Sequence, residues 1–171
     1  MSYVSLTSFR DDNNNDFQYS NTNTDFSCRF REPITINPNS SIRLNFASVY
    51  LTSDLLKRPI FITTSSFTGM KSYMTGIGNV GLLGVIRPSD AIGGSEPGNK
   101  NAMVVDNSFP YIPLKNAEKL EITEITISIK WEDGSVCNNI DGYTGGGDAV
   151  SNENQTTLGL QIIDAEYKDI N

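Results

Sequence analysis

The sequence predicts an all-β sandwich or barrel of about eight strands, and three observations lead to this class. Apolar residues recur at every second position in most segments from Phe26 onward, which is the period of a strand with one wet face. No window keeps the i, i+3, i+4, i+7 apolar spacing of an amphipathic helix through three turns. Short alternating runs are separated by stretches rich in Gly, Pro, Asn and Ser. The 171 residues suit one domain with a single sizeable core.

The first 25 residues predict a polar N-terminal arm. They contain DDNNND (Asp11 to Asp16) and SNTNT (Ser20 to Thr24), which are rich in side chains that hydrogen-bond their own backbone. Two interpretations remain open: a frayed terminus, or an arm that orders only against a neighbouring subunit. We expect the domain itself to span residues 26–165 and to be followed by a C-terminal tail, residues 166–171.

The first half of the domain predicts strands over residues 26–31, 34–36, 42–51 and 60–62. Ile42, Leu44 and Phe46 alternate with polar residues, whereas Val49 and Leu51 continue in the opposite phase. This change of phase predicts a bulge or bend near residues 47–48.

The second half predicts strands over residues 82–86, 103–105, 120–131 and 158–162. The strongest alternation places Ile125, Ile127, Ile129 and Trp131 on one face, and a phase change predicts a second bulge at residues 123–124. The segment FPYIPL (109–114) contains two prolines that withhold ladder donors, so we expect an edge or a well-packed crossing segment there. Asp133-Gly134 predicts a turn.

Composition argues against several functions. The chain has no histidine, which removes the usual general base near neutral pH and the commonest transition-metal ligand, so we expect no enzymatic activity. The 13 basic residues are scattered and the net charge is −7, which argues against direct nucleic-acid binding. No apolar run approaches the length of a membrane helix, so membrane insertion is not expected. MSYVSLTSF lacks the features of a signal peptide, and Cys28 and Cys137 are therefore expected to be free thiols.

The stretch GIGNVG (Gly76 to Gly81) matches the glycine pattern of dinucleotide-binding loops. That fingerprint requires a buried strand before it and a helix directly after it. FTGMKSYMT precedes it and LLGVIRP follows it, and neither fits. We therefore predict a flexible connection that enters the strand at Leu82, and no cofactor.

Two sets of acidic residues are candidate sites. Glu121 and Glu124 could form the carboxylate pair of a glycosidase, but charges on a wet strand face are usually only solvated. Asp141 and Asp148 flank a Gly-rich stretch that could wrap a calcium ion, although its spacing is not that of an EF-hand loop. No catalytic, cofactor-binding or metal site is predicted from them.

Aromatic residues offer a third candidate, a sugar-binding platform made of Trp131, Tyr111 and Tyr143. Trp131 is in phase with Ile125, Ile127 and Ile129, which favours a place in the core instead.

The order of three motifs resembles one family. LLGVIRP (82–88), FPYIPLKN (109–116) and EITEITISIKWEDG (121–134) are followed by a Gly-containing loop and a closing strand, TTLGLQI (156–162). This order is similar to that of the single jelly-roll minor capsid, or penton, proteins of virophages, polinton-like elements and large eukaryotic DNA viruses. FREPITINPNSSIRL (30–44) is similar to the family's opening pair of strands. The chain leaves no room for the outward-facing insertion domain of larger members.

The resemblance implies an eight-stranded single jelly roll that forms homopentamers at the fivefold vertices of an icosahedral capsid. It implies as partners a double jelly-roll major capsid protein and other minor capsid proteins, and as location the virion, after assembly inside the host cell. Two alternatives remain: another minor or cement capsid protein, and a soluble jelly-roll carbohydrate-binding module.

Overall fold

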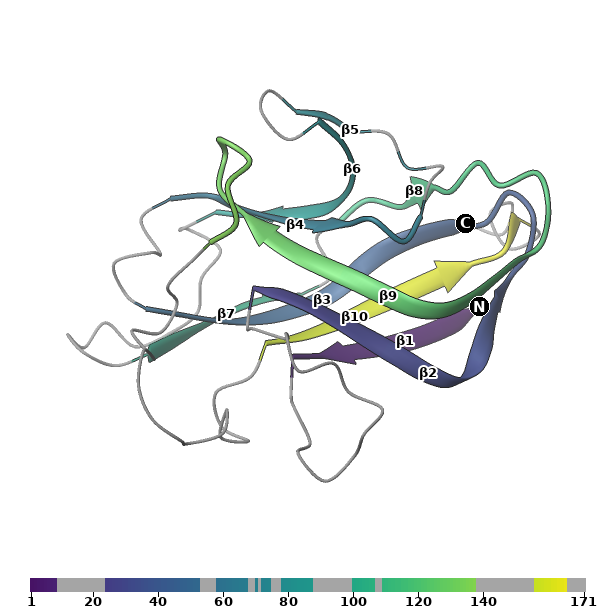
Figure 1. Cartoon of the computed structure of the whole chain (residues 1–171), viewed down its shortest axis with the longest axis horizontal. Coiled ribbons are helices and arrows are strands. Elements are labelled where there is room, and N and C mark those ends of the chain that lie inside the picture. The colour runs from purple at the N-terminus through teal and green to yellow at the C-terminus, as the bar shows by residue number, and fades with distance from the viewer. Residues whose placement is uncertain are drawn as a thin grey trace.

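The protein is a sandwich of two five-stranded antiparallel sheets packed face to face (Figure 1). The computed structural model describes residues 1–8, 24–52, 58–67, 70, 72–74, 78–87, 100–106, 109–137 and 156–165. These residues contain no α-helix, which confirms the predicted all-β class.

Each sheet contains four longer strands and one short one. Sheet A has the order β1 (Ser2–Thr7), β10 (Thr157–Ile163), β3 (Ser41–Thr52) and β7 (Lys100–Asp106), with β8 (Ile112–Pro113) also beside β3. Sheet B has the order β2 (Asp25–Ile36), β9 (Leu120–Lys130), β4 (Ile60–Thr64), β6 (Gly78–Ile86) and β5 (Ser72–Met74).

The longer strands have the nested pairing of a jelly roll. Along the sequence the pairs are nested: the outermost pair is β1 with β10, followed by β2 with β9, β3 with β7 and β4 with β6. Successive pairs lie in alternate sheets, and the contacts β10–β3 and β9–β4 join them within each sheet. A long antiparallel hairpin rolled up in this way is a single jelly roll. The predicted eight-stranded jelly-roll sandwich is confirmed.

The predicted arm is wrong for residues 2–7, which form the edge strand β1. Every residue of β1 has a partner in β10, and Val4 and Leu6 are buried in the core. Two inward apolar positions are too few to stand out as a period, and their partners lie at the far end of the chain. Ser8 and Thr24 of the predicted arm are also buried, and Asp25 begins β2. Residues 9–23 and the predicted tail, 166–171, lie outside the described residues.

Residues 25–36 form one strand, β2, where the sequence predicts two. Its pairing with β9 stops after Arg29 and resumes at Ile34, so four residues of β2 face only Thr123 of β9. Pro33 lies in this interruption and has no N–H to donate. The irregularity predicted at residues 123–124 is confirmed, but the bulge is in β2 and not in the 120–131 strand as predicted.

The bulge in β3 is displaced from its predicted place. Leu44 and Phe46 pair with the adjacent residues Leu160 and Gly159, which leaves Asn45 as the extra residue, ahead of the predicted 47–48. Phe46 is consequently half-buried on the outer face of sheet A.

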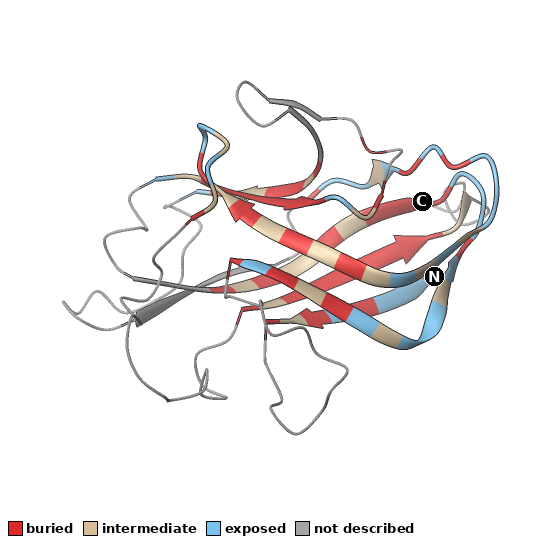
Figure 2. Ribbon diagram, in the orientation of Figure 1, coloured by how far each residue is buried: buried red, intermediate tan, exposed pale blue. Residues whose placement is uncertain are grey.

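The core fills the space between the sheets. Ile42, Leu44, Ile125, Ile127 and Leu160 are fully buried, and Figure 2 shows the alternation of buried and less buried residues along β9. Burying each such side chain stabilises the fold by about 1.5–3 kcal/mol. The predicted alternation of Ile125, Ile127 and Ile129 is therefore confirmed as part of the inward face of sheet B.

The crossing segment predicted at FPYIPL is confirmed. Phe109 and Leu114 are buried, Ile112–Pro113 form the short strand β8 beside β3, and the Leu114 N–H donates to the Ser40 carbonyl oxygen at 2.9 Å. The Asp133-Gly134 turn is also confirmed, with Gly134 at φ 84°.

Gly84 makes room for the crossing segment. A Cβ added to Gly84 would lie 2.4 Å from Cε1 of Phe109 and 3.1 Å from Cδ2 of Leu44. We expect Gly84→Ala to lower the free energy of unfolding by about 1–3 kcal/mol, because an overfilled core must shift its neighbours. Urea unfolding monitored by the fluorescence of Trp131, the single tryptophan, measures this loss.

The matched control for this substitution is Gly81→Ala, whose Cβ would lie 3.1 Å from its nearest neighbours and should cost less. Adding Phe109→Leu to Gly84→Ala should recover part of the loss, since the smaller side chain relieves the contact. Equal effects of both glycine substitutions, with no coupling to Phe109, would contradict this account.

Candidate functional site

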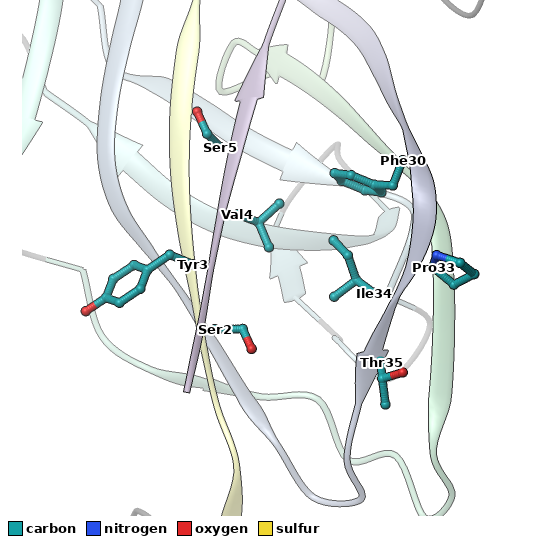
Figure 3. Close-up of a pocket in the computed structure, with 8 residues that line it drawn as sticks. All are labelled: Ser2, Tyr3, Val4, Ser5, Phe30, Pro33, Ile34 and Thr35. Atoms are coloured by element: carbon teal, nitrogen blue, oxygen red, sulfur yellow. The ribbon is translucent and has the colours of Figure 1, made fainter.

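The flank of the sandwich between β1 and β2 is open. A groove of about 610 Å³ lies there, with Val4 on one side and Phe30 and Ile34 on the other. Figure 3 shows these three apolar side chains turned toward one another, whereas the Tyr3 ring points away from the groove. Ser2 and Ser5 add polar groups along its rim.

The groove exists because β1 and β2 are the edge strands of different sheets. At one end of the flank, the Cys28 thiol donates a hydrogen bond to the Thr7 carbonyl oxygen at 3.2 Å. Toward the other end, β2 leaves its register with β9 between Arg29 and Ile34. β1, SYVSLT, contains neither a charged residue nor a proline, the features that commonly protect exposed sheet edges.

A second surface, which we name the tyrosine platform, lies on the outer face of sheet A. It consists of Met1, Tyr3, Arg43 and Tyr111 around the side chain of Gln161. The register places Tyr3 and Arg43 on either side of Gln161, and β8 brings Tyr111 to the same face.

The Gln161 amide holds the platform together although only 2% of the residue is exposed. Its Oε1 accepts from Arg43 Nε at 2.7 Å and from the Tyr111 hydroxyl at 3.0 Å. Its Nε2 donates to the Tyr3 hydroxyl at 2.9 Å and to Met1 Sδ at 3.2 Å. The Arg43 guanidinium lies 4.6 Å from the centre of the Tyr111 ring.

The outer face of sheet B is different, because it carries a ladder of polar pairs between β2 and β9. The Ser27 and Thr126 hydroxyls are hydrogen-bonded at 2.9 Å, and the Ser128 hydroxyl donates to Asp25 at 2.7 Å. Arg29 donates to Glu124 at 2.8 Å. The two outer faces are therefore chemically distinct.

The structure gives Glu121 and Glu124 different surroundings. Glu121 is exposed, whereas Glu124 is ion-paired with Arg29. The hydrogen bond from Arg29 is the main reason that the pKa of Glu124 is lowered. The general acid of a glycosidase needs a raised pKa, so the lowered pKa of Glu124 does not suit this residue to that role.

The aromatic residues considered for a sugar platform are not brought together. Trp131 follows β9 of sheet B and is 8% exposed, which confirms its predicted place in the core. The Arg58 guanidinium lies 4.9 Å from the Trp131 ring centre. Tyr111 lies beside sheet A, and Tyr143 is outside the described residues.

The remaining candidate motifs are only partly described. Asp141 and Asp148 lie outside the described residues, and those that are described contain no cluster of acidic or cysteine side chains able to hold a metal ion. From Gly78 the GIGNVG stretch belongs to β6, so the prediction of a connection reaching to Leu82 was wrong for residues 78–81. Its last glycines are followed by more strand, not by the helix that phosphate binding needs.

Both cysteines are free thiols, as predicted, and both are buried. Burial is the main reason that the pKa of the Cys28 thiol is raised and that the pKa of the Cys137 thiol is raised to about 12. In the part of the chain that is described, no helix is long and apolar enough to span a membrane.

Comparisons with known proteins found a weak likeness among solved structures. No protein-family model and no curated protein matches the sequence. Among solved structures, the VP2 subviral particle of infectious bursal disease virus is similar with a TM-score of 0.33 and 14% identity. The match covers 97% of this chain but 33% of that one, so the chain spans about a third of its length. A likeness of this strength carries no argument about function.

Glu124 makes stability depend on pH. Its folded-state pKa is lowered from 4.5, so its contribution is present above pH 4.5 and is lost as the pH falls through the folded-state pKa. The pair with Arg29 is exposed, so we expect Glu124→Gln to cost no more than about 1 kcal/mol at neutral pH. Urea unfolding between pH 3 and 7 should show that the free energy of unfolding falls less steeply with decreasing pH in the variant than in the wild-type protein. Glu121→Gln, an exposed residue of the same strand, is the control, and an equal change there would contradict this role.

The buried thiols should be unreactive in the folded protein. Because the thiolate is the reactive form and burial disfavours it, we expect native protein at pH 8 to react with an aromatic disulfide reagent at least about tenfold more slowly than protein in 8 M urea. Unfolded protein should release two equivalents per chain, one for each cysteine. Rapid labelling of either thiol in the native protein would show that it is accessible.

Proposed function

We propose that this protein is a structural capsid protein, the penton, whose homopentamer closes the fivefold vertices of an icosahedral DNA virus capsid. The observation that carries the proposal is the nested eight-stranded jelly roll with an open flank along the unprotected edge strand β1. The motif order that resembles single jelly-roll minor capsid proteins supports the same role.

The surfaces of the sandwich suit lateral association. A head-to-tail contact between two different surfaces closes into a ring when its rotation allows, and a fivefold ring needs only one such pair. The groove and the tyrosine platform are on different parts of the subunit, because Tyr3 turns away from the groove (Figure 3). Both features are open surfaces, which suits contacts with other proteins.

In this role the partners are further copies of the chain, a double jelly-roll major capsid protein and other minor capsid proteins. The protein is located at the capsid vertex of the virion, after assembly inside the host cell, and has no catalytic function. Its net charge of −7 supports a role without direct nucleic-acid contact. Two of its arginines, Arg29 and Arg58, are also ion-paired with glutamates.

A soluble carbohydrate-binding module is the second candidate. It is favoured by one observation, the two exposed tyrosines Tyr3 and Tyr111 on the same outer face. Aromatic rings can stack on sugars. If the protein is such a module, the monomer should bind a glycan.

Native mass spectrometry of the full chain between 1 and 50 µM tests the penton. We expect a closed species of five times 18.8 kDa, because five copies of one head-to-tail contact complete the ring. A cement protein should lack this closed pentamer. A monomer or dimer throughout the range contradicts the penton, and a monomer that binds a glycan array supports the carbohydrate-binding module.

A further inference from the structure

The free edge of β1 presents main-chain groups that no described strand pairs with. β1 is hydrogen-bonded to β10 on one side only. The Ser8 N–H donates to the Thr156 carbonyl oxygen at 2.9 Å, and hydrogen-bonded positions alternate along an antiparallel pair. The alternation directs the main-chain groups of Val4 toward β10. It directs the N–H and carbonyl groups of Tyr3 and Ser5 away from β10, along the free edge.

A contact at the end of β1 agrees with this orientation. Thr7 belongs to the same alternate set as Tyr3 and Ser5, and its carbonyl oxygen accepts a hydrogen bond from the Cys28 thiol of β2 at 3.2 Å. The Thr7 carbonyl therefore points toward the flank of the sandwich, where β2 covers it. At Tyr3 and Ser5 the groove separates β1 from β2.

The inward side chains of β2 are incompletely covered along the same stretch. Phe26, Cys28 and Ile36 are buried. Phe30 and Ile34, which line the groove, are only half-buried, and Figure 3 shows both turned into it. In a sandwich of two sheets, the strands of the opposite sheet cover such residues. The groove is thus the place of one further strand of sheet A, beside β1.

The edge and the groove together define the chemistry of an occupant. Unpaired N–H and carbonyl groups along a strand are complementary to another extended backbone. None of the residues that line the groove is charged, although the chain has a net charge of −7. A side chain that lies on Phe30 and Ile34 should therefore be apolar, because an unpaired charge is costly to bury. Since side chains alternate along a strand, the occupant should be apolar at every second position.

A segment outside any folded core suits this place better than the edge strand of a second copy. The inward side chains of such an edge strand are already covered by their own core, as Val4 and Leu6 are here. Pairing of β1 with β1 of another copy would also be a twofold contact, which does not build a fivefold ring. An extended segment has its main-chain groups and its apolar side chains available.

We propose that the free edge of β1 takes up one extended segment of another protein as an additional antiparallel strand of sheet A, with an apolar side chain of that segment on Phe30 and Ile34. The inference rests on the proposed function only for the nature of that protein, another component of the capsid. The edge and the groove themselves are complete in a single subunit. Main-chain hydrogen bonds supply the affinity, and the groove supplies the preference for alternate apolar side chains.

Synthetic peptides test the added strand. Each of three short peptides alternates Thr with one apolar residue, Val, Leu or Phe, and carries Lys at both ends for solubility. The matched control has the same composition with the apolar residues grouped together. We expect at least one alternating peptide to bind at least about tenfold more tightly than its control, because only alternation directs the apolar side chains into the groove. Fluorescence anisotropy of the labelled peptide measures the affinity.

Methylation of peptide nitrogens shows whether the main chain is read. In the added strand the Thr residues lie opposite Tyr3 and Ser5, so their N–H groups face β1. N-methylation at the Thr positions should weaken binding at least about tenfold, because it removes these hydrogen bonds. N-methylation at the apolar positions, whose N–H groups point away from β1, is the control and should weaken binding much less.

Ser5→Pro tests the same hydrogen bonds from the side of the protein. Proline removes the outward N–H of Ser5 without removing a hydrogen bond to β10, and edge strands tolerate proline at such positions. The variant should bind the alternating peptide at least about tenfold more weakly than the wild-type protein. Ser5→Ala keeps the N–H and is the control. Far-UV circular dichroism and Trp131 fluorescence verify that both variants are folded.

Amide hydrogen exchange at single residues gives a readout that needs no variant. In the free protein, we expect the N–H groups of Val4 and Leu6 to exchange slowly and those of Tyr3 and Ser5 to exchange rapidly, because only the first two are bonded to β10. A saturating alternating peptide should slow exchange at Tyr3 and Ser5.

Native mass spectrometry of the same variants separates this inference from the penton. A folded Ser5→Pro protein that remains pentameric but loses peptide binding supports the added strand and leaves the penton standing. Loss of the pentamer in folded Ser5→Pro shows that a second copy occupies the edge, and overturns the choice of partner. A wild-type monomer that binds the alternating peptide supports the added strand and contradicts the penton. The added strand is overturned if no alternating peptide is preferred to its control, or if exchange at Tyr3 and Ser5 does not change.

Discussion

The pairing of β1 with β10 is the constraint on which the rest of the structure depends. It is the outermost of the nested pairs, and it joins the two ends of the chain along the whole length of β1. The pairing buries Val4 and Leu6 against the core. It also brings the amino terminus within 3.4 Å of Asp164 and the Ser8 N–H within 2.9 Å of the Thr156 carbonyl oxygen. Without this pair, β10 would be an edge strand and neither the groove nor the tyrosine platform would form.

The same constraint produces two different surfaces from one strand. Successive side chains of β1 point to opposite sides of sheet A, so Val4 turns inward toward the groove and the core while Tyr3 turns outward to Gln161 (Figure 3). β1 thus has a buried inward side, an outward side that carries the exposed Tyr3, and an edge that pairs with no other described strand.

Electrostatics distinguish the two outer faces. On sheet B, Arg29 and Glu124 neutralise each other within one polar ladder, which limits what that pair offers a partner. On sheet A, Arg43 is held by neutral groups and by an aromatic ring, so its charge is not cancelled locally.

The sequence by itself determined the all-β class, the inward face of β9 with Trp131 in the core, and the packed crossing segment, because period-two alternation and proline act locally. It did not reveal β1, whose two inward residues are too few to show a period and whose partner strand is at the other end of the chain. The sequence did not predict the central position of Gln161 either, because a glutamine in a strand does not indicate which side chains will cover it. Only the tertiary structure brought Tyr3, Tyr111 and Arg43 around it, because that surface is made by register between strands and not by neighbours in sequence.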